Sequence, residues 1–124
     1  MTIWQLLALF FAHWVADFLL QPHWMASTKS KKFGNLVLHV IIYTLVMAIS
    51  FGILTGLDNF GFAYLILLSS HLVIDFGTSK LTSYQWENKK LGGKIFNLGF
   101  FSTIGWDQFL HHAVIFYICW HGLN

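Results

Sequence analysis

Charged side chains are scarce in this sequence, at 10% of 124 residues, whereas 56% of the residues are hydrophobic. Soluble globular chains carry about a quarter of charged residues, so the composition excludes an ordinary soluble domain. Arginine is absent, and seven lysines against five acidic residues leave a net charge of only +2. Because no basic, aromatic surface accompanies this small charge, nucleic acid is not an expected partner.

Cysteine, proline and the common catalytic motifs are also rare or missing. The single Cys119 excludes an internal disulfide, and the single Pro22 leaves long stretches without a helix breaker. The sequence contains no glycine-rich phosphate loop, no G-x-S-x-G elbow and no C-x-x-C pair. Any chemistry of this chain must therefore come from other residue types.

Four apolar segments remain, and each is long enough for a membrane helix of roughly 20 residues. We expect helices at about 3–20, 35–55, 60–81 and 98–120, in a single all-α transmembrane domain that covers residues 1–124. The first segment lacks a basic leader and a small-residue cleavage site, so we interpret it as a retained helix rather than a signal peptide. The short turn at 56–59 favours antiparallel neighbours. The predicted fold is a polytopic four-helix bundle.

The lysines predict the orientation of this bundle, because all seven lie at or in the first and third connections. They are Lys29, Lys31, Lys32, Lys80, Lys89, Lys90 and Lys94. By the positive-inside rule these two connections are cytoplasmic and both termini lie outside. Trp24 and Met25 beside the first lysines indicate a short helix at the membrane interface. We expect a multi-pass protein of a bacterial inner membrane.

Three acidic residues lie inside the predicted membrane helices, and each has a histidine four positions away on the same face. The pairs are His13/Asp17, His71/Asp75 and Asp107/His111. An aspartate at the bilayer centre costs about 2.5–3.5 kcal/mol and needs a partner. The last helix runs opposite to the other two and its pair is reversed, so every aspartate lies cytoplasmic of its histidine. These six side chains and His39 therefore fall in one layer of the membrane.

Three carboxylates in a small dry site repel one another unless cations neutralise them. Histidine nitrogen combined with aspartate oxygen suits zinc, manganese or iron better than calcium or magnesium, and such ligands at helical spacing form metal centres in helix bundles. We therefore predict one or two divalent transition-metal ions, with zinc first and manganese or iron as alternatives. The candidate ligands are His13, Asp17, His39, His71, Asp75, Asp107 and His111. Gln21 and Gln108 flank them as candidate hydrogen-bond partners.

The sequence resembles a family of unknown function that comprises small inner-membrane proteins of bacteria and phages. The resemblance covers nearly the full chain and implies a membrane bundle without implying an activity. It rests on His13-x-x-Ala16-Asp17-Phe18-x-x-Gln21, Met25-Ala26-x-x-Lys29, His39-x-x-x-Tyr43, His71-x-x-x-Asp75 with Lys80, and Asp107-Gln108-x-x-His111. The His-x-x-x-Asp elements are also similar to those of membrane-bound metal-dependent hydrolases, although this chain is shorter and its Asp107 motif departs from their pattern.

A metal-dependent hydrolase is the first functional hypothesis. A bound metal would lower the pKa of a water toward 7, and Asp17, Asp75 or Asp107 would act as general base. The substrate would be a lipid or another ester or phosphoester at headgroup level, reached from the cytoplasmic side. Lys29 and Lys80 lie at nearby helix ends, where they either hold an anionic headgroup or simply anchor the helices.

Two other classes of function remain open on the sequence. A metal-ion or proton transporter would use the same residues as a path, but it needs polar groups that continue to the outer side. A structural accessory subunit would use them only to fix helix packing. The bilayer is the expected partner in every case, and a homo-oligomer is open because four short helices bury little surface.

Overall fold

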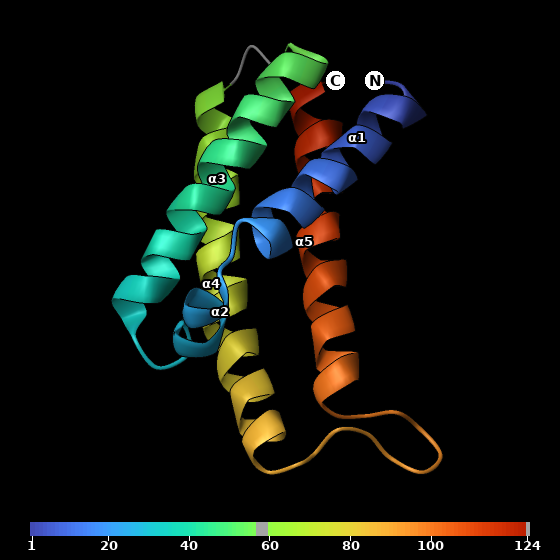
Figure 1. Cartoon of the computed structure of the whole chain (residues 1–124). Helices are drawn as coiled ribbons and strands as arrows, with labels where there is room; N and C mark the ends of the chain where they lie inside the picture. The colour runs from blue at the N-terminus through green and yellow to red at the C-terminus, as the bar shows by residue number, and fades with distance from the viewer. Residues whose placement is uncertain (57–59, 124) are drawn as a thin grey trace.

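The computed structural model describes residues 1–56 and 60–123, and every regular element in these ranges is a helix (Figure 1). Part of the predicted turn at 56–59 lies outside the described residues. The all-α class is confirmed. The elements are α1 (Ile3–Trp14), the π-helix η1 (Val15–Leu19), α2 (His23–Thr28), α3 (Phe33–Thr55), α4 (Phe60–Glu87) and α5 (Phe100–Leu123).

The first predicted helix ends in an unusual turn. After Trp14 the chain widens into η1, where the Leu20 N–H donates to the Val15 carbonyl at 2.9 Å. This is the i→i+5 bond of a π-helix, a local feature that is frequent at functional sites. Pro22 then begins α2 as its N-cap. The first helix therefore stops short of the lysine-bearing end of the bundle, and α2 occupies the connection in which a short helix was predicted.

Four further boundaries differ from the predicted ones. α3 begins at Phe33 rather than residue 35. α4 continues to Glu87 rather than residue 81, because its polar last turns remain helical after the apolar run ends. α5 ends at Leu123 rather than residue 120 and begins at Phe100 rather than residue 98. Its start is fixed by Ser102, whose hydroxyl accepts from the Gly99 N–H at 2.8 Å, a side-chain cap of the kind that satisfies free N–H groups at helix starts.

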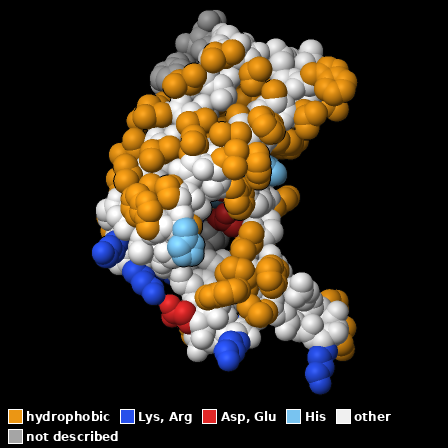
Figure 2. Space-filling view, viewed as in Figure 1, with side chains coloured by type: hydrophobic (Ala, Val, Ile, Leu, Met, Phe, Trp, Pro, Cys, Tyr) orange, Lys and Arg blue, Asp and Glu red, His pale blue; other side chains and the backbone are white. Residues whose placement is uncertain are grey.

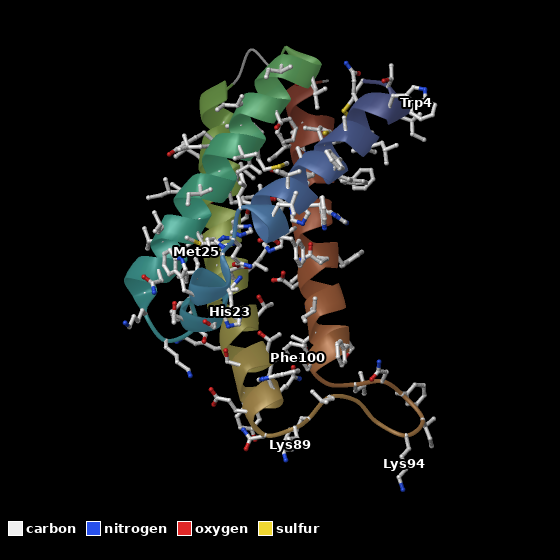
Figure 3. All side chains as sticks on the ribbon, in the orientation of Figure 1. Trp4, His23, Met25, Lys89, Lys94 and Phe100 are labelled. Atoms are coloured by element: carbon white, nitrogen blue, oxygen red, sulfur yellow. The ribbon has the colours of Figure 1, made fainter. Side chains whose placement is uncertain are left out.

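The chain termini and the lysine-bearing connections lie at opposite ends of the bundle. α3, α4 and α5 run along its length, and α1 packs on α3 at the end that holds both termini (Figure 1). Lys89 and Lys94 lie at the other end (Figure 3). The half near the termini is filled by a hydrophobic core of Leu9, Ala16, Tyr43, Met47, Phe51, Ala63, Leu67, Ile115, Ile118 and Cys119.

Two of the helices are long and apolar enough to cross a membrane, namely α3 and residues 61–87 of α4, while the apolar stretch Ile3–Leu19 is shorter. Hydrophobic side chains cover much of the outer surface in Figure 2, and the basic ones gather at one end. Exposed apolar residues include Ile53 at 77% and Leu65 at 64% of their full accessibility. Such extended apolar surface is unusual for a soluble monomer.

Candidate metal centre

Four elements bring ionisable side chains together at the edge of the hydrophobic core that faces the lysine-bearing end of the bundle. Asp17 comes from η1, His39 from α3, His71 and Asp75 from α4, and His111 from α5. None of these five is more than 3% exposed. The helices that carry them are those the sequence predicted, and i,i+4 spacing places His71 and Asp75 on one face of α4.

Four donor atoms of this cluster lie within 4.8 Å of one another. His39 Nε2 lies 3.0 Å from Asp17 Oδ1 and 3.3 Å from Asp75 Oδ2. His71 Nε2 lies 3.5 Å and 3.4 Å from the same two oxygens, and 3.0 Å from His39 Nε2. Ligands at about 2.0–2.2 Å from a tetrahedral zinc ion are separated by about 3.3–3.6 Å. The spacing of these donors is therefore close to that of a four-coordinate site.

Hydrogen bonds satisfy this arrangement only in part. His39 Nε2 hydrogen-bonds with Asp17 Oδ1 and with His71 Nε2, and the tautomer of each ring decides which nitrogen donates. In the described part of the chain, Nδ1 of both histidines is buried without a hydrogen-bond partner. A cation at the centre would accept a lone pair from all four atoms. The donor set fits a divalent transition metal of the type that binds imidazole and carboxylate together.

A second group of possible ligands adjoins the first. Asp17, Asp107 and His111 each offer an atom within 4.8 Å of the others. His111 Nε2 lies 3.1 Å from Asp75 Oδ1, whereas Asp75 Oδ2 faces the first group. Asp17 and Asp75 thus connect both groups through their carboxylates, and the geometry has room for one ion or for two linked ions.

Lys29 reaches this centre from the segment after α2. Its ammonium lies 2.9 Å from Asp75 Oδ2, and its side chain is only 15% exposed. Burial by itself would lower the pKa of the amino group, but the charges of Asp75 and Asp17 outweigh burial and raise it. Lys29 is therefore a partly buried cation that pairs with a candidate metal ligand. Lys80 differs, because it donates to the Ser30 carbonyl at 2.9 Å and does not line the pocket described below.

His13 lies outside both groups of possible ligands. The Gln108 amide nitrogen donates to Asp17 Oδ2 at 3.3 Å and Asp107 Oδ2 at 3.0 Å, so the Gln108 oxygen must face His13 Nε2, at 2.6 Å. That nitrogen is then a donor, and Nδ1 of a neutral imidazole accepts from Tyr43 Oη at 2.8 Å. In this structure His13, a predicted ligand, instead orients Gln108, which in turn holds carboxylates of both groups.

Three further side chains, those of Gln21, Thr78 and Tyr43, contact residues of the centre, and of these the sequence predicted a hydrogen-bonding role for Gln21. Gln21 donates to the backbone carbonyl of Asp17 at 3.2 Å rather than to its carboxylate. Thr78 Oγ1 donates to Asp107 Oδ1 at 2.6 Å, and the Tyr43 ring stacks on His71 with a centroid distance of 3.8 Å. Sequence reasoning assigned no role to Thr78, although its position three residues after Asp75 places it on the same side of α4.

A pocket of about 580 Å³ leads from the centre toward the lysine-bearing end. Asp17, Asp75 and Asp107 line it, and Figure 2 shows a hollow with an acidic side chain inside. His23 of α2 and Phe100 of α5 also line it (Figure 3). Its remaining lining combines polar and apolar side chains: Phe18, Gln21, Ala26, Ser27, Lys29, Lys31, Thr78, Ser79, Thr82, Ser83, Trp86, Glu87, Ile104 and Gln108.

Residues 5–123 match the family described as "Protein of unknown function (DUF3307)", and the chain belongs to that family. No curated protein and no solved structure matches the chain. The predicted membership of a family of unknown function is confirmed, and it assigns no activity, so a functional conclusion has to come from the site itself.

Proposed function

We propose that this chain is a membrane-embedded metalloprotein that hydrolyses an ester or phosphoester at the level of lipid headgroups, from the cytoplasmic side. Asp17, His39, His71 and Asp75 would hold one divalent transition-metal ion, with zinc first. Asp107 and His111 would complete a second site. The observation that carries this proposal is the close spacing of the first four donor atoms, 3.0–3.5 Å in five of their six pairs.

The proposed membrane arrangement has four spans, formed by α1 with η1, α3, α4 and α5. α3 and α4 are each long and apolar enough to cross a membrane. The other two spans pack with them around the same hydrophobic core. The separation of the termini from the lysine-bearing connections supports a cytoplasmic position of the lysines. The pocket would then open toward the cytoplasm or the inner leaflet.

The residues around the pocket have complementary roles in hydrolysis. The metal would supply a bound water of lowered pKa. Asp107, with 14% of its side chain exposed, lines the pocket and would accept a proton from a water that enters it. Thr78 and Gln108 each donate a hydrogen bond to that carboxylate and fix its orientation. Asp107 lies outside the first four ligands, so with only the first ion bound it is the general base that we favour among the three aspartates.

The hydrophobic core argues for a site rather than a transport path. Leu9, Met47, Phe51, Ile115 and Ile118 are all 0% exposed and fill the half of the bundle near the termini. An ion that crossed the bundle would need polar groups along that half. In the described part of the chain, the residues that line the pocket lie between the centre and the lysine-bearing end, not along the half near the termini.

Elemental analysis of the purified protein in mild detergent tests the metal centre. Wild-type protein should contain one or two equivalents of zinc, manganese or iron per chain, and Asp75→Asn should lose most of it. Glu87→Gln is the matched control, because Glu87 is an exposed carboxylate paired with Lys31. A folded wild-type protein that binds no such metal, even when metal is added, would contradict the proposal.

A second assay separates hydrolysis from metal binding. Wild-type protein should cleave an aryl phosphate ester in detergent, and Asp107→Asn should lower turnover about 10²–10⁴-fold while the first metal remains bound. Equal turnover in the two proteins would reject Asp107 as the general base. A metal-loaded protein without turnover on any ester would reject the hydrolase and leave a metal-binding role.

A further inference from the structure

Ser79 carries a buried hydroxyl that the fold leaves unused. It is 6% exposed, lines the pocket, and its Oγ has no hydrogen-bond partner in the described structure. A serine inside a helix usually donates to a carbonyl of the preceding turn. Ser50 does so to Val46 and Ser69 does so to Leu65, each at 2.7 Å. Ser79 does not, so its donor is unused. Its Oγ is buried in the pocket wall, and rotation about χ1 would turn it toward a ligand in the pocket.

Lys29 faces the same pocket with donors to spare. An ammonium has three N–H donors, and the described contacts use one of them, on Asp75. Ser79 follows Asp75 by four positions on α4, which is about 6 Å along the helix axis. Both residues line the pocket beside the candidate metal centre, where Lys29 provides a partly buried positive charge and Ser79 an unused hydroxyl.

We propose that Lys29 and Ser79 form an anion subsite that binds the phosphoryl group of the substrate. The inference rests on the proposed function and specifies its substrate class as a phosphate ester. Ser79 lies one helical turn from Asp75, and Lys29 Nζ lies 2.9 Å from an Asp75 carboxylate oxygen, so we expect different oxygens of one phosphoryl group to reach both this subsite and the metal centre. Lys29 would contribute charge and Ser79 a hydrogen bond to an oxyanion, the stronger kind of hydrogen bond in proteins.

The charge of the centre favours phosphate over a neutral ester. The two ligand groups contain three aspartates and adjoin one lysine. When two divalent ions occupy both ligand groups, the three aspartates, the lysine and the ions together carry a formal charge of about +2, which a phosphate dianion neutralises. The phosphate can belong to a lipid or to a soluble ester. The pocket wall also contains the apolar side chains of Phe18, Trp86 and Ile104, which an acyl chain could contact.

Calorimetric titration of the zinc-loaded full chain in detergent tests this subsite with two probes, inorganic phosphate and a short-chain phosphatidic acid. Ser79→Ala should weaken the binding of both probes about tenfold with unchanged zinc content, and Lys29→Gln should weaken it further. Ser69→Ala is the matched control, because that hydroxyl is satisfied within its own helix, and it should bind as wild type does. Tighter binding of the lipid than of inorganic phosphate, lost in Ser79→Ala, identifies a lipid phosphate. Equal binding, also lost in Ser79→Ala, identifies a soluble one.

The result that overturns the subsite is equal affinity of Ser79→Ala and wild type for both probes, or no binding by zinc-loaded wild type. Zinc content, measured on each sample, keeps this failure apart from failure of the metalloprotein. Metal bound without phosphate binding rejects only the subsite. Phosphate bound in a Ser79-dependent manner by protein that takes up no metal keeps the subsite and rejects the metal centre.

Discussion

His39 Nε2 and His71 Nε2 face each other across 3.0 Å, and each lies within 3.5 Å of a carboxylate oxygen of Asp17 and of Asp75. Nδ1 of each ring is buried without a hydrogen-bond partner in the described part of the chain, and an unsatisfied buried group costs about 1–3 kcal/mol. A cation bound by both Nε2 atoms would replace their contact with each other and offset the charges of the two carboxylates.

Metal binding should therefore stabilise the fold. Zinc at 100 times its dissociation constant adds about 2.7 kcal/mol, which corresponds to a rise in Tm of roughly 10 °C for a chain of this size. His71→Ala should abolish the rise, and a chelator should reverse it in the wild type. His121→Ala is the control, because His121 is exposed at the other end of α5. A Tm that zinc leaves unchanged in detergent would contradict a specific centre.

Gln108→Leu should weaken metal binding without removing a ligand. Gln108 holds Asp17 and Asp107 in place by two hydrogen bonds, and loss of such outer partners typically lowers metal affinity 10–100-fold. Competition with a fluorescent zinc chelator measures the change. Gln5→Leu is the matched control, because Gln5 donates to the Leu54 carbonyl far from the centre. Equal affinity in both variants would show that Gln108 does not position the carboxylates.

Lys29→Met should have opposite effects on the metal-free and metal-loaded protein. Without metal, Asp75 loses its ammonium partner, and an uncompensated buried charge costs roughly 3 kcal/mol of unfolding free energy. With metal, a competing cation is gone, so zinc should bind about tenfold more tightly. Denaturation and zinc titration measure the two effects. Lys31→Met, which removes an exposed ion pair, should change neither, and weaker zinc binding by Lys29→Met would contradict the competition.

The proposed membrane topology predicts opposite labelling of two single cysteines. With the buried Cys119 changed to serine, Thr2→Cys should react with an impermeant maleimide from the outer side of the inner membrane. Lys94→Cys should react only after lysis, because it lies at the lysine-bearing end (Figure 3). Mass spectrometry of the labelled protein measures both. Labelling of the two positions from the same side would reject an odd number of spans between them.

The convergence of the acidic residues could be predicted because two simple rules determine it. Spacing of four residues fixes the face within a helix, and alternating helix direction fixes the level of Asp17, Asp75 and Asp107. Tertiary contacts decide the rest. His13 shares the same spacing, but its two ring nitrogens hydrogen-bond with the Gln108 oxygen and the Tyr43 hydroxyl. The spacing in a single sequence does not show which neighbours a histidine will contact.

The role of Lys29 was the least predictable, because it depends on a connection rather than on a regular span. A lysine beside Trp24 and Met25 is typical of the membrane interface, and charge counting assigned it there. In the structure Met25 is 2% exposed and anchors α2 to the bundle, and Lys29, four residues later, reaches Asp75. The π-turn of η1 was likewise not apparent, since nothing in its apolar sequence distinguishes a π-bond pattern from an α-helical one.

The early end of the first helix has a consequence for the lipid around it. α1 and η1 contain 12 and 5 residues, which together extend about 25 Å or less, whereas the hydrocarbon core of a bilayer is about 30 Å thick. In the proposed arrangement this hydrophobic mismatch would be relieved by local thinning of the membrane next to η1. Headgroups and water would then descend to the level of Asp17, and a lipid could present its polar end to the centre without being extracted from the leaflet.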